Sequence, residues 1–138
     1  MADTPAFNPA TAGWEIYAEK GLIDLVGPLW ERRKDGIWQL GLFAEERHVN
    51  TRGVVHSGAL LTLLDQALGV AGWVVNGGAP QVTVQLDVQF VAAVQPGEFI
   101  EAEGRVVRQT QSLLFMQGTC TVGARCRDRK RNLKLLGK

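Results

Sequence analysis

The sequence predicts an α+β fold in which one long apolar helix packs on an antiparallel sheet. Residues 58–75 form the longest apolar stretch of the chain, and Asn76-Gly-Gly-Ala-Pro80 would end a helix there. After this stretch in the sequence, apolar and polar residues alternate in the runs 81–94, 98–109 and 112–122, as they do in half-buried strands. Consecutive strands joined by short turns pair antiparallel, so the strands follow one another instead of alternating with helices.

The segment before the long helix is expected to add a strand and one or two short helices. Residues 1–12, with two prolines and small polar neighbours, are predicted to form a flexible arm, and residues 13–138 a single domain. Apolar residues at mixed helical spacing over 13–34 predict the short helices. The run 37–43 follows an Asp35-Gly36 turn and predicts a strand.

Composition excludes several classes of protein. The formal net charge is +1, so no global field attracts the chain to nucleic acid or to membranes. Cys120 and Cys126 are too few for a disulfide framework and lack neighbouring zinc ligands, which favours reduced thiols in the cytoplasm and no metal. No signal peptide is expected at the start of the sequence. Residues 58–75 are long enough to cross a bilayer, but Asp65 and Gln66 at their centre argue against a membrane span.

Asp65 is the main candidate for a functional residue. It lies inside the apolar stretch, where desolvation disfavours its charged form, and such a cost usually has a functional reason. The structural alternative is a carboxylate that is hydrogen-bonded to a neighbouring helix or loop. Gly58 lies where the helix begins, so its backbone N–H lacks an intrahelical partner and can stabilise a developing oxyanion.

The spacing of these two residues predicts a site shared between subunits. Gly58 and Asp65 are seven residues apart on one helix face. At the rise of an α-helix they stand roughly 10 Å apart along the axis, so one reacting carbonyl cannot touch both in a single chain. Two antiparallel copies of the helix across a two-fold axis would bring Gly58 of one chain to Asp65 of the other. We therefore expect a homodimer.

Three further polar residues are candidates for supporting roles. Asn50 could hold a water molecule or the entry of the helix, His56 could orient the loop by hydrogen bonds to backbone, and Thr83 could position water. Asn50 is equally well explained as a turn residue, and His56 is better explained as a structural hydrogen-bonding group than as a base. Ser57 would suggest a nucleophile, but no Gly-x-Ser-x-Gly motif surrounds it.

The pattern Arg47-His48-x-Asn50-x-x-Gly53-x-x-His56-Ser57-Gly58, followed by Leu63-x-Asp65-x-Ala67-x-Gly69, resembles the signature of hotdog-fold acyl-CoA thioesterases of the phenylacetate-pathway type. The resemblance extends over roughly residues 20–122. Ser57 stands where the family usually has glycine, but its backbone N–H remains.

The resemblance implies a set of roles. Asp65 would be the catalytic carboxylate, Gly58 the oxyanion donor, Asn50 and His56 supporting residues, and Thr83 a water-binding hydroxyl. It also implies a helix wrapped by an antiparallel sheet and dimers that pair into a homotetramer. Coenzyme A would lie at the subunit interface, where Arg108 or Ser112 would meet its phosphates.

We therefore expect a thioesterase that hydrolyses an acyl-CoA carrying an aryl, phenylacetyl-type or medium-chain acyl group. Asp65 would act as a general base or as a nucleophile, and no cofactor is expected beyond the coenzyme A of the substrate. One alternative is a hotdog dehydratase or hydratase, but His56 lies before the helix and not after the aspartate. The other is a non-catalytic acyl-CoA sensor, which would normally carry a DNA-binding segment.

The C-terminal region departs from the family. Residues 126–133 have no apolar face, whereas the family ends in an apolar, alternating strand. Plausible codons for them, shifted by one base, read Val-Val-Thr-Ala-Ser-Gly-Ile, which would be a conventional last strand. We hypothesise a compensated pair of frameshifts. The alternative is a genuine basic end, solvated or binding nucleic acid, with a weakened edge strand. In-frame codons for the present residues in related genes would exclude the frameshift.

Overall fold

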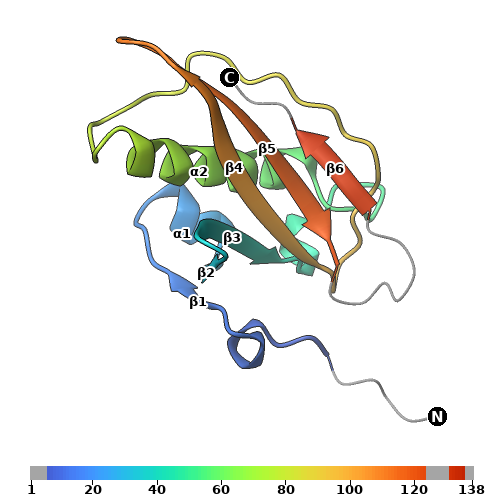
Figure 1. Cartoon of the computed structure of the whole chain (residues 1–138). Helices are drawn as coiled ribbons and strands as arrows, with labels where there is room; N and C mark the ends of the chain where they lie inside the picture. The colour runs from blue at the N-terminus through green and yellow to red at the C-terminus, as the bar shows by residue number, and fades with distance from the viewer. Residues whose placement is uncertain (1–5, 124–130, 136–138) are drawn as a thin grey trace, which may run out of the picture.

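The computed structural model describes residues 6–123 and the backbone of residues 131–135. Six strands form one antiparallel sheet in the order β1-β2-β3-β4-β5-β6, and the long helix α2 crosses one of its faces (Figure 1). The predicted α+β arrangement is confirmed. The strands are β1 (Glu15–Tyr17), β2 (Leu29–Lys34), β3 (Ile37–Phe43), β4 (Phe99–Gln109), β5 (Leu114–Val122) and β6 (Arg131–Leu135). The helices are η1 (Pro9–Ala12), α1 (Leu22–Val26), η2 (Glu46–His48) and α2 (Ser57–Val75).

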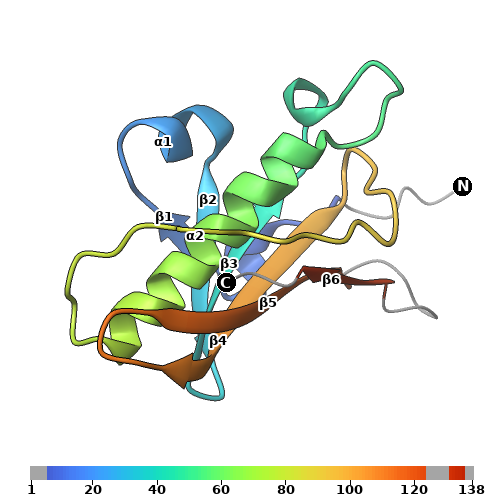
Figure 2. The ribbon, with the colours of Figure 1, turned by 90° about the horizontal axis from the view of Figure 1, so that it is seen from above.

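Helix α2 forms where the apolar stretch predicts it, and it packs mainly on β3, β4 and β5. Its core-facing side chains include Leu63, Leu64 and Ala67, which are fully buried. Two glycines of the sheet lie directly beneath the helix. A Cβ atom at Gly118 would come 2.8 Å from Leu64 Cδ1, and one at Gly104 would come 3.0 Å from Leu68 Cδ2. These glycines allow the close approach of helix and sheet that Figure 2 shows from above.

The opposite side of α2 is open in the single chain. Asp65 and Gly69 are half-buried, and Trp73 is 51% exposed. The length and hydropathy of α2 would also suit a membrane span, but in this fold its buried side chains belong to the core of the sheet. The resemblance implies a helix wrapped by the sheet. In the single chain the sheet packs on one side of α2, and outside the sheet Gln81 and Thr83 hydrogen-bond to the helix.

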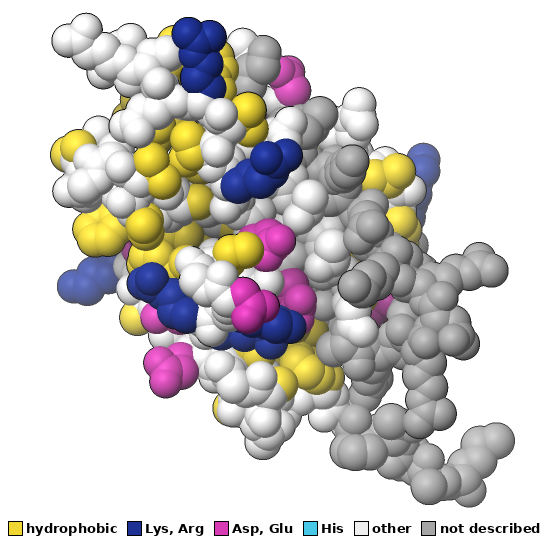
Figure 3. Space-filling view, in the orientation of Figure 1, with side chains coloured by type: hydrophobic (Ala, Val, Ile, Leu, Met, Phe, Trp, Pro, Cys, Tyr) yellow, Lys and Arg dark blue, Asp and Glu magenta, His cyan; other side chains and the backbone are white. Residues whose placement is uncertain are grey.

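Residues 81–94 differ from the prediction. Strands were expected over 37–43, 98–109 and 112–122, and they form as β3, β4 and β5. The run 81–94 contains no strand, apart from an isolated bridge at Leu86. Alternation makes a strand possible, but a strand also needs a hydrogen-bonded neighbour along its length. The side chains of Val82 and Val84 in this run are exposed. Apolar side chains gather at the left of the face that Figure 3 shows.

The segment 13–34 also differs from the prediction of helices alone. It contains one short helix, α1, between the strands β1 and β2. At the turn between β2 and β3, Asp35 and Gly36 both have positive φ, at 51° and 76°. This geometry favours a tight hairpin whose twist matches that of the strands. Pairing of β2 with β3 therefore outweighs the local helical spacing of the apolar residues.

The N-terminal arm packs on the sheet where the structure describes it. The rings of Phe7 and Trp14 each lie 4.9 Å from that of Phe99, on the face of the sheet opposite α2. Ile100, the next residue of β4, faces the core on the other side. At the C-terminus, β6 pairs with β5, but the side chains of residues 126–133, on which the frameshift hypothesis rests, lie outside the described residues.

We expect Gly118→Val to lower the free energy of unfolding by about 1–3 kcal/mol, because the new Cβ would overlap a well-packed region. Besides Leu64, it would come 3.1 Å from the carbonyl oxygen of Glu103, which cannot rotate away. The control is Gly69→Ala, since no atom lies within 4 Å of a Cβ at Gly69. Alanine there should add about 0.5–1 kcal/mol through helix propensity. Urea unfolding measures both, and a Gly118→Val protein as stable as wild type would contradict the packing described.

Candidate functional site

Asp65 and Thr83 meet at the open face of α2. The Thr83 hydroxyl donates a hydrogen bond of 2.6 Å to Asp65 Oδ1. Residues 81–94 therefore bring Thr83 to the helix although they form no strand. No described residue hydrogen-bonds Oδ2 of the carboxylate. The result is a carboxylate that one hydroxyl orients and whose second oxygen is available to a ligand.

The first turn of α2 has one occupied and one open backbone donor. His56 is the N-cap, and its Nδ1 accepts a hydrogen bond of 2.8 Å from the Gly58 N–H. The side chain of His56 thus holds the donor that we predicted for an oxyanion. The Ser57 N–H has no acceptor among the residues that the structure describes. Because the first N–H groups of a helix lack intrahelical partners, Ser57 presents an unsatisfied donor at the positive end of α2.

Asn50 shapes the loop before α2. Its Oδ1 accepts hydrogen bonds from the backbone N–H groups of Arg52, at 2.9 Å, and Val54, at 3.4 Å. Its own backbone N–H donates to the Val54 carbonyl at 2.8 Å, and Gly53 completes the turn with φ of 78°. Within the described residues, the side-chain amide nitrogen of Asn50 has no partner. Asn50 is therefore a turn residue that also keeps a free donor.

His48 is a structural residue to which the sequence pattern assigned no role. It is buried, its Nδ1 accepts from the Glu45 N–H at 2.9 Å, and its Nε2 donates to the Val26 carbonyl at 2.5 Å. Its own carbonyl accepts a hydrogen bond of 2.7 Å from the His56 N–H. His48 therefore connects the end of α1, the helix η2 and the start of α2. Its place in the motif was visible in the sequence, but its partners come from segments that spacing does not identify.

The two residues predicted to meet coenzyme A lie away from Asp65. Arg108 is exposed on β4, and Ser112 is exposed in the turn between β4 and β5. In Figure 1 the tip of this hairpin lies on the side of the C-terminal end of α2, whereas Ser57 and Gly58 begin the helix at its other end. Within one chain the structure does not bring them together with the other candidates, and their contact with coenzyme A stays a prediction.

The fold is the hotdog fold, with a long central helix against an antiparallel sheet. Residues 52–125, more than half of the chain, match the family described as the thioesterase superfamily. The chain is also 33% identical over 113 residues to a candidate esterase, PA0474, of Pseudomonas aeruginosa, covering 80% of this chain and 84% of that protein. The protein belongs to the thioesterase superfamily.

Human acyl-coenzyme A thioesterase 13 is a second relative, 32% identical over 71 residues, which are 51% of this chain and 51% of that enzyme. Among solved structures, zebra fish thioesterase superfamily member 2 superposes with a TM-score of 0.71 at 24% identity, covering 86% of this chain and 88% of that chain. A thioesterase-like protein of Streptococcus pneumoniae, crystallised with coenzyme A, gives 0.59 at 21% identity, with 80% and 87% covered. These two structures support the fold.

We expect Asn50→Ala to destabilise the loop and Asn50→Asp to leave its stability unchanged. Alanine removes the acceptor for the N–H groups of Arg52 and Val54, which should cost about 0.5–1.5 kcal/mol for each hydrogen bond lost. Aspartate keeps an acceptor oxygen in the same place and removes only the amide donors. Thermal and urea unfolding of the two variants measure the difference. An Asn50→Asp protein as unstable as Asn50→Ala would contradict the turn geometry.

Proposed function

We propose that the protein hydrolyses an acyl-CoA thioester with an aryl or medium-chain acyl group, releasing the free acid and coenzyme A. The observation that carries the proposal is the Asp65 carboxylate on α2, oriented by Thr83 through Oδ1 and open at Oδ2. Membership of the thioesterase superfamily, the acyl-CoA activity in the name of the human relative, and the coenzyme A in the bacterial structure support it.

In the proposed mechanism, Asp65 is the general base that accepts a proton from the attacking water. Water attacks the thioester carbonyl while Asp65 Oδ2 accepts its proton, and general base catalysis of this kind contributes about 10²–10⁴-fold. The carbonyl oxygen becomes an oxyanion, the C–S bond then breaks, and the coenzyme A thiolate leaves and takes up a proton. In the alternative course, Asp65 itself attacks the carbonyl, the C–S bond breaks and the coenzyme A thiolate leaves. Water then hydrolyses the mixed anhydride to the free acid and regenerates the Asp65 carboxylate.

We assign the oxyanion donor to the Ser57 N–H in place of Gly58. The Gly58 N–H already donates to His56 Nδ1, so an oxyanion would have to displace this cap. The Ser57 N–H needs no such displacement and has the helix dipole behind it. Donors of this kind contribute a few kcal/mol to transition-state stabilisation. The free amide of Asn50 is a second donor at the same end of the helix.

This assignment requires two chains. Ser57 and Asp65 are eight residues apart on α2, about 12 Å along the axis, which is too far for one thioester carbonyl. We propose a homodimer in which α2 of each chain faces the other in antiparallel orientation, so that each site combines Asp65 of one copy with Ser57 of the second. Val82 and Val84 precede and follow Thr83 in the sequence, and their exposed fractions are 86% and 77%. Their side chains supply apolar area for this contact.

The first test is thiol release from a panel of acyl-CoA esters. Asp65→Asn and Asp65→Ala should lower kcat by about 10²–10⁴-fold, because the general base is lost. Thr83→Val should lower it by about tenfold, since one orienting hydrogen bond is lost. Undiminished turnover in both Asp65 variants would exclude the mechanism. A wild-type protein that binds the esters and turns over none would instead favour a non-catalytic acyl-CoA sensor.

The second test separates the two backbone donors. Proline is tolerated at the first position of a helix and has no N–H, so Ser57→Pro removes the proposed donor and preserves the helix start. We expect a loss of about 10²–10³-fold in kcat, while Ser57→Ala, which keeps the N–H, stays near wild type. Equal activities of the Pro and Ala variants would exclude Ser57 as the donor.

The same variants test whether sites are shared. Equal amounts of Asp65→Asn and Ser57→Pro chains, unfolded and refolded together, should form mixed dimers with one intact site. The mixture should recover roughly a quarter of the wild-type rate, since half of randomly formed dimers are mixed and each has one of two sites. Each variant refolded alone is the control. A mixture no more active than these controls would contradict a shared site.

A further inference from the structure

Residues 81–84 reach the open face of α2 without a backbone hydrogen bond to any residue that the structure describes. The position of Thr83, which orients Asp65, is therefore not set by pairing with a described strand. Side chains hold this segment on the helix, and the contact next to Thr83 is made by Gln81. The Gln81 amide nitrogen donates a hydrogen bond of 2.7 Å to the carbonyl oxygen of Gly69.

The contacts of Gln81 and Thr83 are in register with the turns of α2. Gln81 and Thr83 both contact the helix, whereas Val82 between them is exposed, and this alternation is that of an extended chain. Two residues of an extended chain span about 6.6 Å. Their partners, Gly69 and Asp65, are four residues apart, about 6 Å along the helix axis. Because the two lengths match, the contact of Gln81 determines which turn of the helix Thr83 meets.

The absence of a side chain at Gly72 makes room for the Gln81 amide. A Cβ atom at Gly72 would come 2.7 Å from Gln81 Oε1 and 2.8 Å from Gln81 Nε2. Gly72 lies inside α2, where alanine would have the higher helix propensity, so glycine lowers stability at this position. Asn76 Nδ2 donates to Gln81 Oε1 at 3.2 Å, so hydrogen bonds hold both the oxygen and the nitrogen of the amide.

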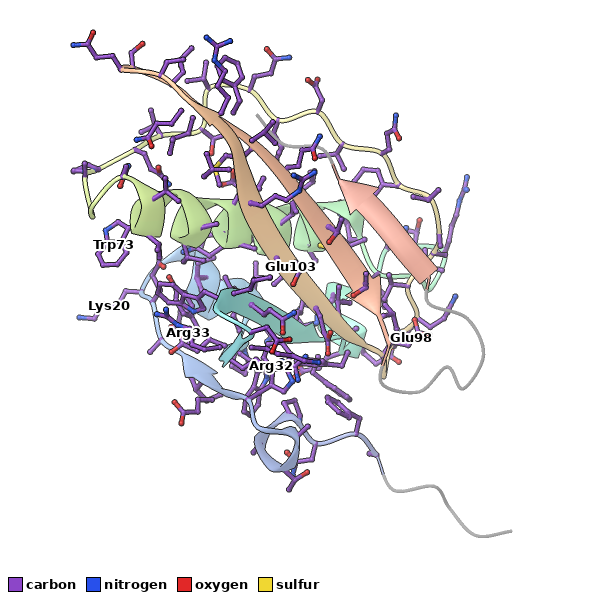
Figure 4. All side chains as sticks on the ribbon, in the orientation of Figure 1. Lys20, Arg32, Arg33, Trp73, Glu98 and Glu103 are labelled. Carbon is purple, nitrogen blue, oxygen red and sulfur yellow. The ribbon has the colours of Figure 1, made fainter. Side chains whose placement is uncertain are left out.

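The turn after α2 brings Gln81 back to the helix. Gly77 and Gly78 have positive φ, 72° and 81°, and the Gly78 N–H donates to the Trp73 carbonyl at 2.9 Å. A Cβ atom at Gly78 would come 3.2 Å from the Trp73 ring, and Figure 4 shows this side chain at the C-terminal end of α2. Among the described residues, Gln81 has the first side chain after this turn that hydrogen-bonds to α2.

Stabilisation of the helix end does not account for the bond from Gln81. Carbonyls without an intrahelical donor belong to the last turn of a helix. The helix α2 ends at Val75, so the Gly69 carbonyl lies further inside, where the N–H four residues on is its regular donor. Gln81 therefore adds a second donor to a carbonyl that does not need one. The consequence of the bond is the position of the segment that carries Thr83.

We propose that Gln81 is a positioning residue for the thioesterase reaction. Its hydrogen bond to the Gly69 carbonyl, in the space left by Gly72, fixes the place where Thr83 meets Asp65. The inference rests on the proposed function and extends it to residues that do not touch the reacting atoms. Without this bond the Thr83 hydroxyl would occupy more than one position, and Asp65 Oδ2 would be presented to the attacking water in more than one orientation.

The first test replaces Gln81 by methionine, which keeps the length of the side chain and removes the donor. For the acyl-CoA ester of the panel that turns over fastest, Gln81→Met should lower kcat by about three- to tenfold. KM should stay near the wild-type value, because the orientation of the base changes and the binding of the ester does not.

Gln85→Met is the matched control, because Gln85 is a glutamine of the same segment whose amide donates to Asp87, at 2.9 Å, and not to the helix. It should leave kcat unchanged. A Gln81→Met enzyme as active as wild type, or a Gln85→Met enzyme equally impaired, would overturn the proposal.

A double-mutant cycle tests whether Gln81 acts through Thr83. Thr83→Val alone should lower kcat by about tenfold, as stated above. Adding Gln81→Met to Thr83→Val should leave kcat within about twofold of the single variant, since the hydroxyl that Gln81 positions is already absent. Two losses that multiply, as they do for independent residues, would contradict the positioning role.

Gly72→Ala disturbs the same contact from the helix. The new Cβ displaces the Gln81 amide, so kcat should fall as far as in Gln81→Met. In a Gln81→Ala chain, Gly72→Ala should leave kcat unchanged. The urea midpoint should rise more on Gly72→Ala in the Gln81→Ala chain than in wild type, because only the wild type loses a hydrogen bond when it gains helix propensity.

The two readouts separate the inference from the proposed function. Equal shifts of the urea midpoint in the two backgrounds would show that Gly72 and Gln81 are not in contact, whatever the activity, and would overturn the inference alone. A wild-type protein that hydrolyses none of the esters would overturn the thioesterase function and the role of Gln81 in it, even where the midpoints confirm the contact.

Discussion

The close packing of α2 on β4 and β5 is the contact on which the rest of the structure depends. Gly104 and Gly118 lie under Leu64 and Leu68, and a side chain at either glycine would force the helix away from the sheet. The contact fixes both the depth of α2 and its rotation about its own axis. Because Leu64 points into the core, Asp65, the next residue, is turned toward the open face. The position of the carboxylate thus follows from apolar packing, and no polar contact with the core is needed to hold it.

The start of α2 is fixed by hydrogen bonds, in contrast to its middle. His48 joins three segments through its two ring nitrogens and its carbonyl, and the last of these bonds holds the backbone of His56. His56 in turn caps the Gly58 N–H. A helix begins with several N–H groups that lack partners, and this network satisfies some and leaves that of Ser57 open. An open donor that is held at the start of a hydrogen-bonded helix suits an anionic transition state better than a mobile donor does, because no reorganisation is needed when the charge develops.

The sequence predicted the elements that local pattern determines. A long apolar run with a glycine-rich end predicted the helix that forms as α2. Alternation between turns predicted the strands that form as β3, β4 and β5. The strands β1 and β2 were missed because their local spacing is overridden by pairing, of β2 with β3 across the Asp35-Gly36 turn and of β1 with β2. Residues 81–94 were predicted as a strand because alternation is visible in one chain, whereas the neighbour that a strand requires is not. Asp65 and Thr83 were each named as candidates from the sequence, but the hydrogen bond between them was not predicted. The cap on Gly58 depends on the orientation of an imidazole ring, which no spacing reveals.

Asp65 was expected to carry a high desolvation cost because its sequence neighbours are apolar. In the folded chain those neighbours, Leu63, Leu64 and Ala67, face the sheet, while Asp65 remains half-buried, so one chain can fold without removing the charge fully from water. In the proposed dimer the second copy covers this face. Burial of Val82 and Val84, at about 25 cal/mol per Å² of apolar area, would then offset the desolvation of the carboxylate. Exclusion of water also strengthens the interaction of the carboxylate with its attacking water and of the oxyanion with its donor. In the proposed dimer, the desolvation free energy of Asp65 is therefore a cost of association and not of folding of the single chain. Association is also the step that completes the site.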